Sequence, residues 1–396
     1  MEKTTEINTL VLQGEQPRLF REEHIELNAR LWAGSFNAKE SSMHQLAPYV
    51  GKLKSGMVRV LIGLYSRPGD VVLDPFCGAG VVPLECVILG RHAIANDLSP
   101  YAYVITRGKL SAPPTEQEAL HKAEDALREI ESRIRTVTTD NVPDWVYKFF
   151  HPDTLKEIVT AFQVFKEREN YFLISCLLGI LHHVRPGFLS YPASHLTPYL
   201  RLKKYPPKEF PEMYSYRDLR SRLLAKVARA YRRTGFTQLK NQMTWRVLQE
   251  NTMNLSLPSN SIDTIISSPP YFGALDYARD NRLRLWFLGV SDWKELDRSL
   301  TASDQAYIPQ MKQCLRQVDR VLKKGAYCVL VLGDVERNGV KKHTAQIVSE
   351  LAQEASDGRL VQNLIYTDEI PDVRRSRRRT RTTRYERILV MQKLSK

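Results

Sequence analysis

Residues 71–80, VVLDPFCGAG, join a short apolar run to a glycine-rich turn. The run is rich in β-branched residues and predicts a buried strand, and VVPLECVILG at 81–90 predicts a helix directly after the turn. A second strand is predicted at 92–96, HAIAN, and Asp97 closes it. Parallel strands that are joined through a helix normally belong to a doubly wound sheet. The segment therefore predicts an α/β protein.

The rest of the chain extends this sheet and interrupts it once. Apolar, β-branched segments predict further strands at 245–248, 262–266, 326–334 and 384–394, and helical periodicity at 53–66 and 307–325 predicts helices that accompany them. Between the two groups, 112–140 and 153–184 predict helices without strands. We therefore expect three parts, which are an N-terminal extension at 1–43, a catalytic domain formed by 44–110 and 244–396, and a mostly helical, basic insertion at 111–243.

The glycine-rich turn has the character of a ligand-binding loop. Glycines after a strand let the backbone approach a ligand closely, and Asp74 can accept hydrogen bonds from a cationic amino group. Asp97 suits the capture of ribose hydroxyls, although Asp97-Leu98-Ser99-Pro100 would also begin a helix well, with Asp97 as its N-cap. The turn lacks the third glycine of a nicotinamide-binding GxGxxG loop, which argues against a dehydrogenase.

Ser268-Pro269-Pro270-Tyr271 is the most specific motif in the chain. It follows a predicted strand, and ligands of open α/β folds bind at the carboxyl ends of strands. Two prolines remove two backbone donors and leave a rigid turn rich in carbonyl acceptors, to which an amine can donate. Tyr271 could then stack on a base flipped out of the helix. The alternative is a loop that only ends a strand.

DPFCGAG, NDLSP and SPPY together resemble the cofactor-binding and catalytic motifs of the S-adenosylmethionine-dependent amino-methyltransferases that make N4-methylcytosine or N6-methyladenine in DNA. HQLAPYVGK at 44–52 is similar to the family segment that covers the methionine end of the cofactor. The resemblance implies a Rossmann-like, seven-stranded methyltransferase sheet with S-adenosylmethionine as cofactor. The cofactor-binding residues that it implies are Tyr49, Asp74, Pro75, Phe76, Gly78, Gly80, Asp97, Leu98 and Asn251. Asn251 stands where the family usually has an acid.

The resemblance also implies a mechanism of direct methyl displacement, in which Ser268 and the Pro269 carbonyl accept the amino protons of the base. Serine before Pro-Pro-Tyr is commonest in the cytosine branch, so N4 of cytosine is favoured over N6 of adenine. No cysteine follows a proline, so the nucleophile of C5-cytosine methyltransferases is missing. A transfer RNA guanine-N2 methyltransferase and a non-catalytic nucleic-acid-binding protein remain as alternatives.

The charge of the chain indicates a polyanionic partner. The net charge is +14, and two segments account for it, 201–240 with twelve Lys/Arg against three Asp/Glu and 374–387 with eight Arg against one Glu. We expect DNA contacts from the second segment, at Arg374, Arg375, Arg377, Arg378, Arg379 and Arg381. The insertion at 111–243 is the candidate DNA-recognition region, and its tyrosines could equally stack on bases or form its own core. A cognate restriction endonuclease or a defence-system protein is a further candidate partner.

The remaining composition excludes several classes of protein. No apolar run approaches the roughly 18 residues that cross a bilayer, and the start lacks the apolar core of a signal peptide, so we expect a cytoplasmic protein. The five cysteines are scattered singly, which predicts reduced thiols without a zinc site. His182 and His183 are adjacent and would face different directions on a helix, so no metal site is predicted.

Overall fold

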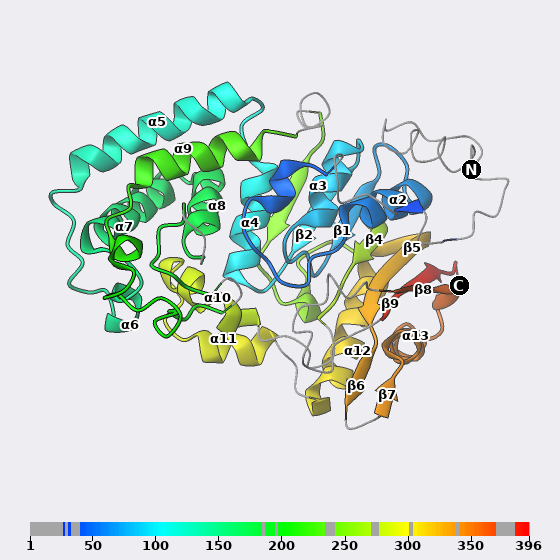
Figure 1. Cartoon of the computed structure of the whole chain (residues 1–396). Helices are drawn as coiled ribbons and strands as arrows, with labels where there is room; N and C mark the ends of the chain where they lie inside the picture. The colour runs from blue at the N-terminus through cyan, green and yellow to red at the C-terminus, as the bar shows by residue number, and fades with distance from the viewer. Residues whose placement is uncertain are drawn as a thin grey trace.

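The centre of the molecule is a seven-stranded sheet with the strand order β3-β2-β1-β4-β5-β9-β8 (Figure 1). The computed structural model describes residues 27, 31–32, 40–183, 187–194, 197–233, 242–270, 277–300, 304–337, 340–369 and 385–395. Neighbouring strands from β3 to β5 are parallel, and β9 is antiparallel to both β5 and β8. The predicted Rossmann-like, seven-stranded α/β fold is confirmed. The strands of the sheet are β1 (Val71–Asp74), β2 (His92–Asn96), β3 (Trp245–Leu248), β4 (Ile262–Ser267), β5 (Leu322–Gly333), β8 (Leu360–Glu369) and β9 (Tyr385–Lys393).

Alternate side chains of the strands supply two apolar cores, one on each face of the sheet. Val72 and Ile266 belong to the first core, whereas their neighbours Leu73 and Ile265 belong to the second. This follows from the two-residue period of a strand, which points successive side chains to opposite faces. The first core contains α2 (Ser55–Tyr65), α3 (Val81–Ile88) and α4 (Pro100–Leu110), and the second contains α12 (Asp304–Val321) and α13 (Thr344–Ala355).

Between β2 and β3 the chain forms a helical layer that packs beside α4 (Figure 1). Its helices are α5 (Glu116–Arg133), α6 (Asp144–Tyr147), α7 (Pro152–Glu167), α8 (Tyr171–Ile180) and α9 (Leu219–Ala230). Leu127 of α5, Phe162 of α7 and Leu177 of α8 are buried in the same core as Val72 of β1. The helical layer and the sheet therefore share one hydrophobic core.

Shorter elements complete the described chain. They are the 3-10 helices η3 (Ser42–Gln45), η4 (Pro211–Tyr214) and η5 (Thr252–Asn254), the helices α10 (Tyr277–Phe287) and α11 (Trp293–Leu300), and the hairpin of β6 (Val335–Arg337) and β7 (Val340–Lys342). In the N-terminal extension, Trp32 is buried and donates from Nε1 to Asp368 of β8 at 3.3 Å. None of the described helices has the length and apolar character needed to cross a membrane.

The predicted elements differ from the observed ones mainly at their ends. The strand predicted at 92–96 matches β2 residue for residue, whereas the helix predicted at 112–140 begins at Glu116, after its N-cap Thr115, and ends at Arg133. The sequence does not predict strand β8. This strand has β9 as its neighbour on one side, most of its side chains are at least partly exposed, and its register shifts between Gln362 and Leu364, so the sequence shows no clean alternation.

Candidate functional site

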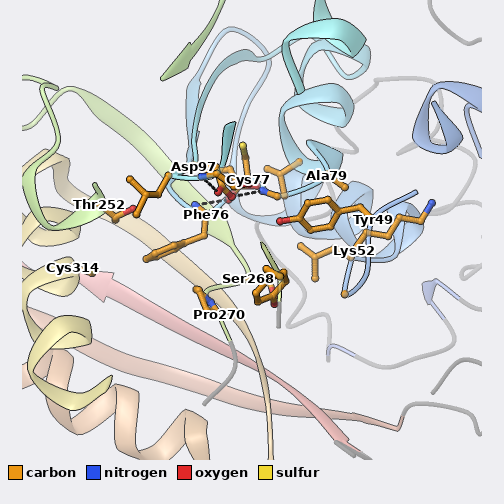
Figure 2. Close-up of a pocket in the computed structure, with 18 of the residues that line it drawn as sticks. Tyr49, Lys52, Phe76, Cys77, Ala79, Asp97, Thr252, Ser268, Pro270 and Cys314 are labelled. Carbon is orange, nitrogen blue, oxygen red and sulfur yellow. Dashed lines mark hydrogen bonds between the residues drawn. The ribbon is translucent and has the colours of Figure 1, made fainter. Parts of the chain in front are cut away.

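The carboxyl ends of β1, β2 and β4 meet at one cavity that is partly open to solvent (Figure 2). Parallel strands bring residues that follow each strand to the same edge of the sheet. Asp74 ends β1, Asp97 follows β2 and Ser268 follows β4. The wall also includes the predicted cofactor residues Tyr49, Phe76, Gly78, Leu98 and Asn251, together with Pro270.

The turn between β1 and α3 needs glycine at two positions. Gly78 and Gly80 have φ of 45° and 68°, a region that side chains other than glycine rarely adopt. A Cβ on Gly78 would lie 3.1 Å from Cε1 of Tyr49, and one on Gly80 would lie 2.5 Å from Oγ1 of Thr106. Gly80 does not line the cavity but begins α3 as its N-cap.

Side chains behind the turn hold its carbonyl groups. Thr106 donates from Oγ1 to the Gly78 carbonyl at 3.3 Å, and the buried Lys109 donates from Nζ to the Ala79 carbonyl. Thr252 donates from Oγ1 to the Pro75 carbonyl at 2.8 Å. Pro75 itself lies outside the cavity wall, so its contribution is to shape the turn.

Asp74 is a buried carboxylate with two internal donors. Its Oδ1 accepts from the backbone N–H of Phe76 at 3.2 Å and from Oγ of Ser267 at 2.6 Å. Burial raises the pKa of Asp74 from 3.8 to about 7, against the opposing effect of these two hydrogen bonds. The carboxyl is thus costly to ionise unless a cation lies beside it.

Asp97 is fixed in the same way on the opposite side of the turn. Its Oδ2 accepts from the Gly78 N–H at 2.8 Å and its Oδ1 from the Ser99 N–H at 2.9 Å, as the dashed lines of Figure 2 indicate for the residues drawn. Burial raises the pKa of Asp97 to about 6. The N-cap of α4 is Ser99, so the alternative that Asp97 caps this helix is wrong.

Ser268 is oriented by a neighbouring strand. Its Oγ donates to the Val331 carbonyl of β5 at 3.0 Å. A hydroxyl has one proton and two acceptor lone pairs, so this bond leaves Ser268 as an acceptor toward the cavity. Pro269 is buried and does not line the cavity. Tyr271 and the predicted DNA-contacting arginines at 374–381 lie outside the described residues.

The sequence profile of the N6/N4 DNA methylases, described as DNA methylase, matches residues 15–107 and 262–396. The chain belongs to the N6/N4 DNA methylase family. The profile passes over 108–261, which includes the helical layer that packs against α4. S-adenosylmethionine is the methyl donor of this family.

Two curated proteins and several solved structures are similar to this N6/N4 DNA methylase. The type II methyltransferase M.BsoBI of Geobacillus stearothermophilus is 25% identical over 321 residues, which cover 74% of this chain and 62% of the relative. The type II methyltransferase M.MjaII of Methanocaldococcus jannaschii is 32% identical over 68 residues, 17% of this chain and 13% of the relative. The chain thus spans less than two-thirds of the length of either curated relative.

Among solved structures, TrmN from Thermus thermophilus matches with 13% identity and a TM-score of 0.36, over 89% of this chain and 53% of TrmN. A SAM-dependent methyltransferase from Methanosarcina mazei matches with 12% identity and a TM-score of 0.34, over 85% of this chain and 98% of that protein.

The cavity of this N6/N4 DNA methylase fits S-adenosylmethionine by its charge and its surface. The cofactor carries a sulfonium and an ammonium group, and a cation beside the buried carboxyl of Asp74, whose pKa is raised, would favour its ionised form. Phe76 and Met253 give the cavity apolar walls suited to a purine ring. The amide of Asn251 also lines the cavity, where its Oδ1 accepts from the Met253 N–H at 3.0 Å.

Several residues of the site carried no sequence signal. Ser267 donates to the Asp74 carboxylate, Thr252 donates to the Pro75 carbonyl of the turn, and Tyr277 lines the cavity. Each of them lies far along the chain from the turn between β1 and α3. Cys77 lines the cavity, and its thiol lies 3.6 Å from Oγ1 of Thr106. All five cysteines are free and buried. Within the described residues, no group of three or more His, Cys, Asp or Glu could hold a metal.

Proposed function

We propose that this chain transfers the methyl group of S-adenosylmethionine to the exocyclic amino nitrogen of a base flipped out of DNA, with N4 of cytosine favoured over N6 of adenine. The observation that carries the proposal is that the carboxylates of Asp74 and Asp97 line one cavity together with Ser268. The Ser268 hydroxyl already donates its hydrogen to the Val331 carbonyl, so its oxygen is left to accept. This arrangement offers anions to a cationic cofactor and an acceptor to an amine.

The cofactor supplies a methyl group that its sulfonium has already activated, so the protein mainly binds and orients. Asp74 would bind the ammonium group and Asp97 the ribose hydroxyls, with Tyr49, Phe76, Leu98 and Asn251 around them. Gly78 lets the backbone come close. The buried position of Asp74 strengthens its interaction with a cation, because little water competes.

Ser268 and the Pro269 carbonyl would accept hydrogen bonds from the two N–H groups of the target amine. Pro269 does not line the ligand-free cavity, so its carbonyl would have to turn toward the bound base. Accepting both hydrogen bonds draws the nitrogen lone pair out of conjugation with the ring and directs it at the methyl group. Tyr271 would stack on the base and Pro270 would keep the turn rigid. A covalent enzyme intermediate is not required for this displacement.

DNA is the proposed partner because the family is one of DNA methylases and the chain carries a net charge of +14. We assign DNA recognition to the insertion at 111–243 and backbone contacts to the arginines between 374 and 381. The curated relatives are type II methyltransferases, which makes a cognate restriction endonuclease a partner worth testing for in neighbouring genes.

The test is transfer of labelled methyl groups to duplex DNA, single-stranded DNA and transfer RNA, followed by nucleoside digestion and mass spectrometry. N4-methylcytosine in DNA, lost in Tyr271→Ala and retained in Tyr271→Phe, supports the proposal, because phenylalanine preserves the stacking ring. N6-methyladenine would correct the base alone. Label confined to transfer RNA as N2-methylguanine would overturn the choice of DNA.

A further inference from the structure

Two groups of cations in the basic segment 201–240 have different surroundings. The first lies on α9 and just before it, and its members bond to other parts of the protein. Arg220 pairs with Glu124 at 2.6 Å and with Glu131 at 3.3 Å, and Lys226 donates to the Gln45 carbonyl at 2.8 Å. Arg217 likewise donates to the carbonyls of Phe188, Ser190 and Met213. These contacts stabilise the helical layer.

The second group lies on residues 199–208, which we call the lysine turn. Lys203, Lys204 and Lys208 are exposed, and no carboxylate of the described residues pairs with any of them. Lys204 lies 5.3 Å from the ring centre of Tyr205. Tyr199 and Leu202, in the same turn, are 51% and 47% exposed, among the most exposed large apolar side chains of the described chain. The turn thus combines positive charge with an uncovered aromatic ring.

The lysine turn is held in a defined shape by its own backbone. The N–H groups of Lys204 and Tyr205 both donate to the Arg201 carbonyl, and the Arg201 N–H donates to the Pro192 carbonyl at 2.8 Å. Tyr214 donates from its hydroxyl to the Tyr205 carbonyl at 2.5 Å. A turn fixed in this way loses little conformational entropy when it binds a partner.

The turn is also anchored next to the cavity. Arg282 of α10 donates to the Pro198 carbonyl at 2.8 Å, and α10 begins at Tyr277, which lines the cavity. Five residues of helix separate these two positions by about 7.5 Å along the axis. Figure 1 shows the green chain of this region beside α10 and α11.

We propose that the lysine turn is a DNA-contacting element, in which Lys203, Lys204 and Lys208 bind phosphates while Tyr199 and Leu202 contact the duplex beside the flipped base. Phosphates are the complementary partner because the turn is basic and its exposed apolar side chains can pack on sugars and bases. The inference rests on the proposed function for the identity of the nucleic acid. It narrows the proposed DNA contact within the insertion to one turn.

The test is the binding of a fluorescein-labelled duplex of mixed sequence to the full chain, followed by anisotropy between ~50 and ~200 mM salt. The variant is Lys203→Gln/Lys204→Gln/Lys208→Gln. Its matched control is Lys122→Gln/Lys166→Gln/Lys324→Gln, which removes three exposed lysines from α5, from α7 and from the amino end of β5. Loss of three phosphate contacts should lower the slope of log K against log salt by up to about 2.7 and weaken binding about tenfold at moderate salt. The control should bind like the wild type.

Equal binding by the two variants would overturn the proposal, and so would the absence of duplex binding by the wild type. If the lysine-turn variant lost binding to polyglutamate but bound the duplex like the wild type, the turn would be a docking surface for acidic protein segments. That result would also overturn the proposal. Both variants should unfold within about a degree of the wild type, since exposed substitutions change stability little. The assay needs no methyl transfer, so failure of the proposed activity would show separately, as a wild type that binds DNA but leaves it unmethylated.

Discussion

The carboxyl of Asp74 lowers the stability of the ligand-free protein. Its pKa is about 7 in the folded chain and 3.8 as an ordinary carboxyl, so between these values the folded state binds more protons than the unfolded state. Stability from this group therefore falls as pH rises through that window, and the cost is complete above about pH 7. We expect Asp74→Asn to raise the unfolding free energy of the apo protein on the order of 2 kcal/mol at pH 8. It should also abolish binding of S-adenosylmethionine.

Thermal unfolding of the wild type and of Asp74→Asn at pH 4.5 and pH 8 measures the change in stability. Calorimetric titration of both proteins with the cofactor measures the loss of binding. The gain in stability should be much smaller at pH 4.5, which lies near the lower end of the window between pH 3.8 and about 7. Asp140→Asn serves as the control because this carboxyl is exposed. A variant that binds the cofactor as tightly as the wild type would rule out Asp74 as its anionic partner.

Ser268 should affect the chemical step and leave cofactor binding intact. Its hydroxyl hydrogen is held by Val331, so replacing it by alanine removes an acceptor for the target amine. We expect Ser268→Ala to lower the single-turnover rate of methyl transfer about 10- to 100-fold, with the cofactor Kd unchanged within about twofold. Ser261→Ala is the matched control, since Ser261 precedes the opposite end of the same strand. Equal rates for the two variants would contradict this role for Ser268.

The residues that could be predicted at the site are those whose signal is local. Asp74 ends β1 directly before Pro75, and Asp97 follows β2 three residues before Pro100, so the local sequence indicates both the turn and the acid. Ser267 acts on Asp74 from 193 positions away, and Thr252 reaches Pro75 across 177. Such contacts depend on the pairing of β1 with β4 and on η5, which a single sequence does not display.

At the scale of elements, α4 and α8 pack through a position that tolerates only glycine. A Cβ on Gly108 would lie 2.2 Å from Oγ of Ser175 and 2.6 Å from the backbone oxygen of Tyr171. The second contact is backbone, so side-chain rotation cannot relieve it. We expect Gly108→Ala to lower the unfolding free energy by about 3 kcal/mol, measured by urea unfolding. Because α4 also carries Thr106 and Lys109, which hold the turn, cofactor affinity should fall as well.

Gly90→Ala provides the comparison for this prediction. Gly90 has φ of 76°, and no atom lies within 4 Å of the place that a Cβ would take, so its substitution costs only the left-handed backbone, about 1 kcal/mol. If Gly108→Ala cost no more than Gly90→Ala, the close approach of α4 and α8 would not exist in solution. If it cost more and Ser175→Ala failed to rescue it, the backbone contact would be the cause.

Elements were predictable where one segment carried the whole pattern. Strand β2 lies where the sequence predicts it. Helix α7 (Pro152–Glu167) lies within the region 153–184 that the sequence predicts to be helical. Strand β8 was missed because its stability comes from pairing with β9, not from an alternating pattern. Part of the charge of α9 has partners that the sequence alone does not reveal. Its Arg220 meets acids of α5, Glu124 and Glu131, about 90 residues away.

For the whole molecule, the shared core makes the insertion and the sheet one folding unit. Leu127 and Leu177 of the helical layer are buried with Val72 and Leu84 of the sheet half. Domains that fold independently have cores of their own, and here the core crosses both boundaries of the insertion. We therefore expect thermal unfolding in a single transition, with tryptophan fluorescence and far-ultraviolet circular dichroism changing together.

A sharper test of whether the helical layer and the sheet unfold together uses the cofactor, whose proposed contacts all lie in the sheet half. At about 100 times its Kd, S-adenosylmethionine should stabilise the protein by about 2.7 kcal/mol. If unfolding is global, hydrogen exchange of α8 amides should slow by the same increment as that of β1, although α8 does not line the cavity. Leu177→Ala in α8 should lower the unfolding midpoint of both parts, at a cost of about 2–5 kcal/mol. Protection confined to β1 would mean that the helical layer opens by itself, so that DNA could rearrange it without loosening the cofactor site.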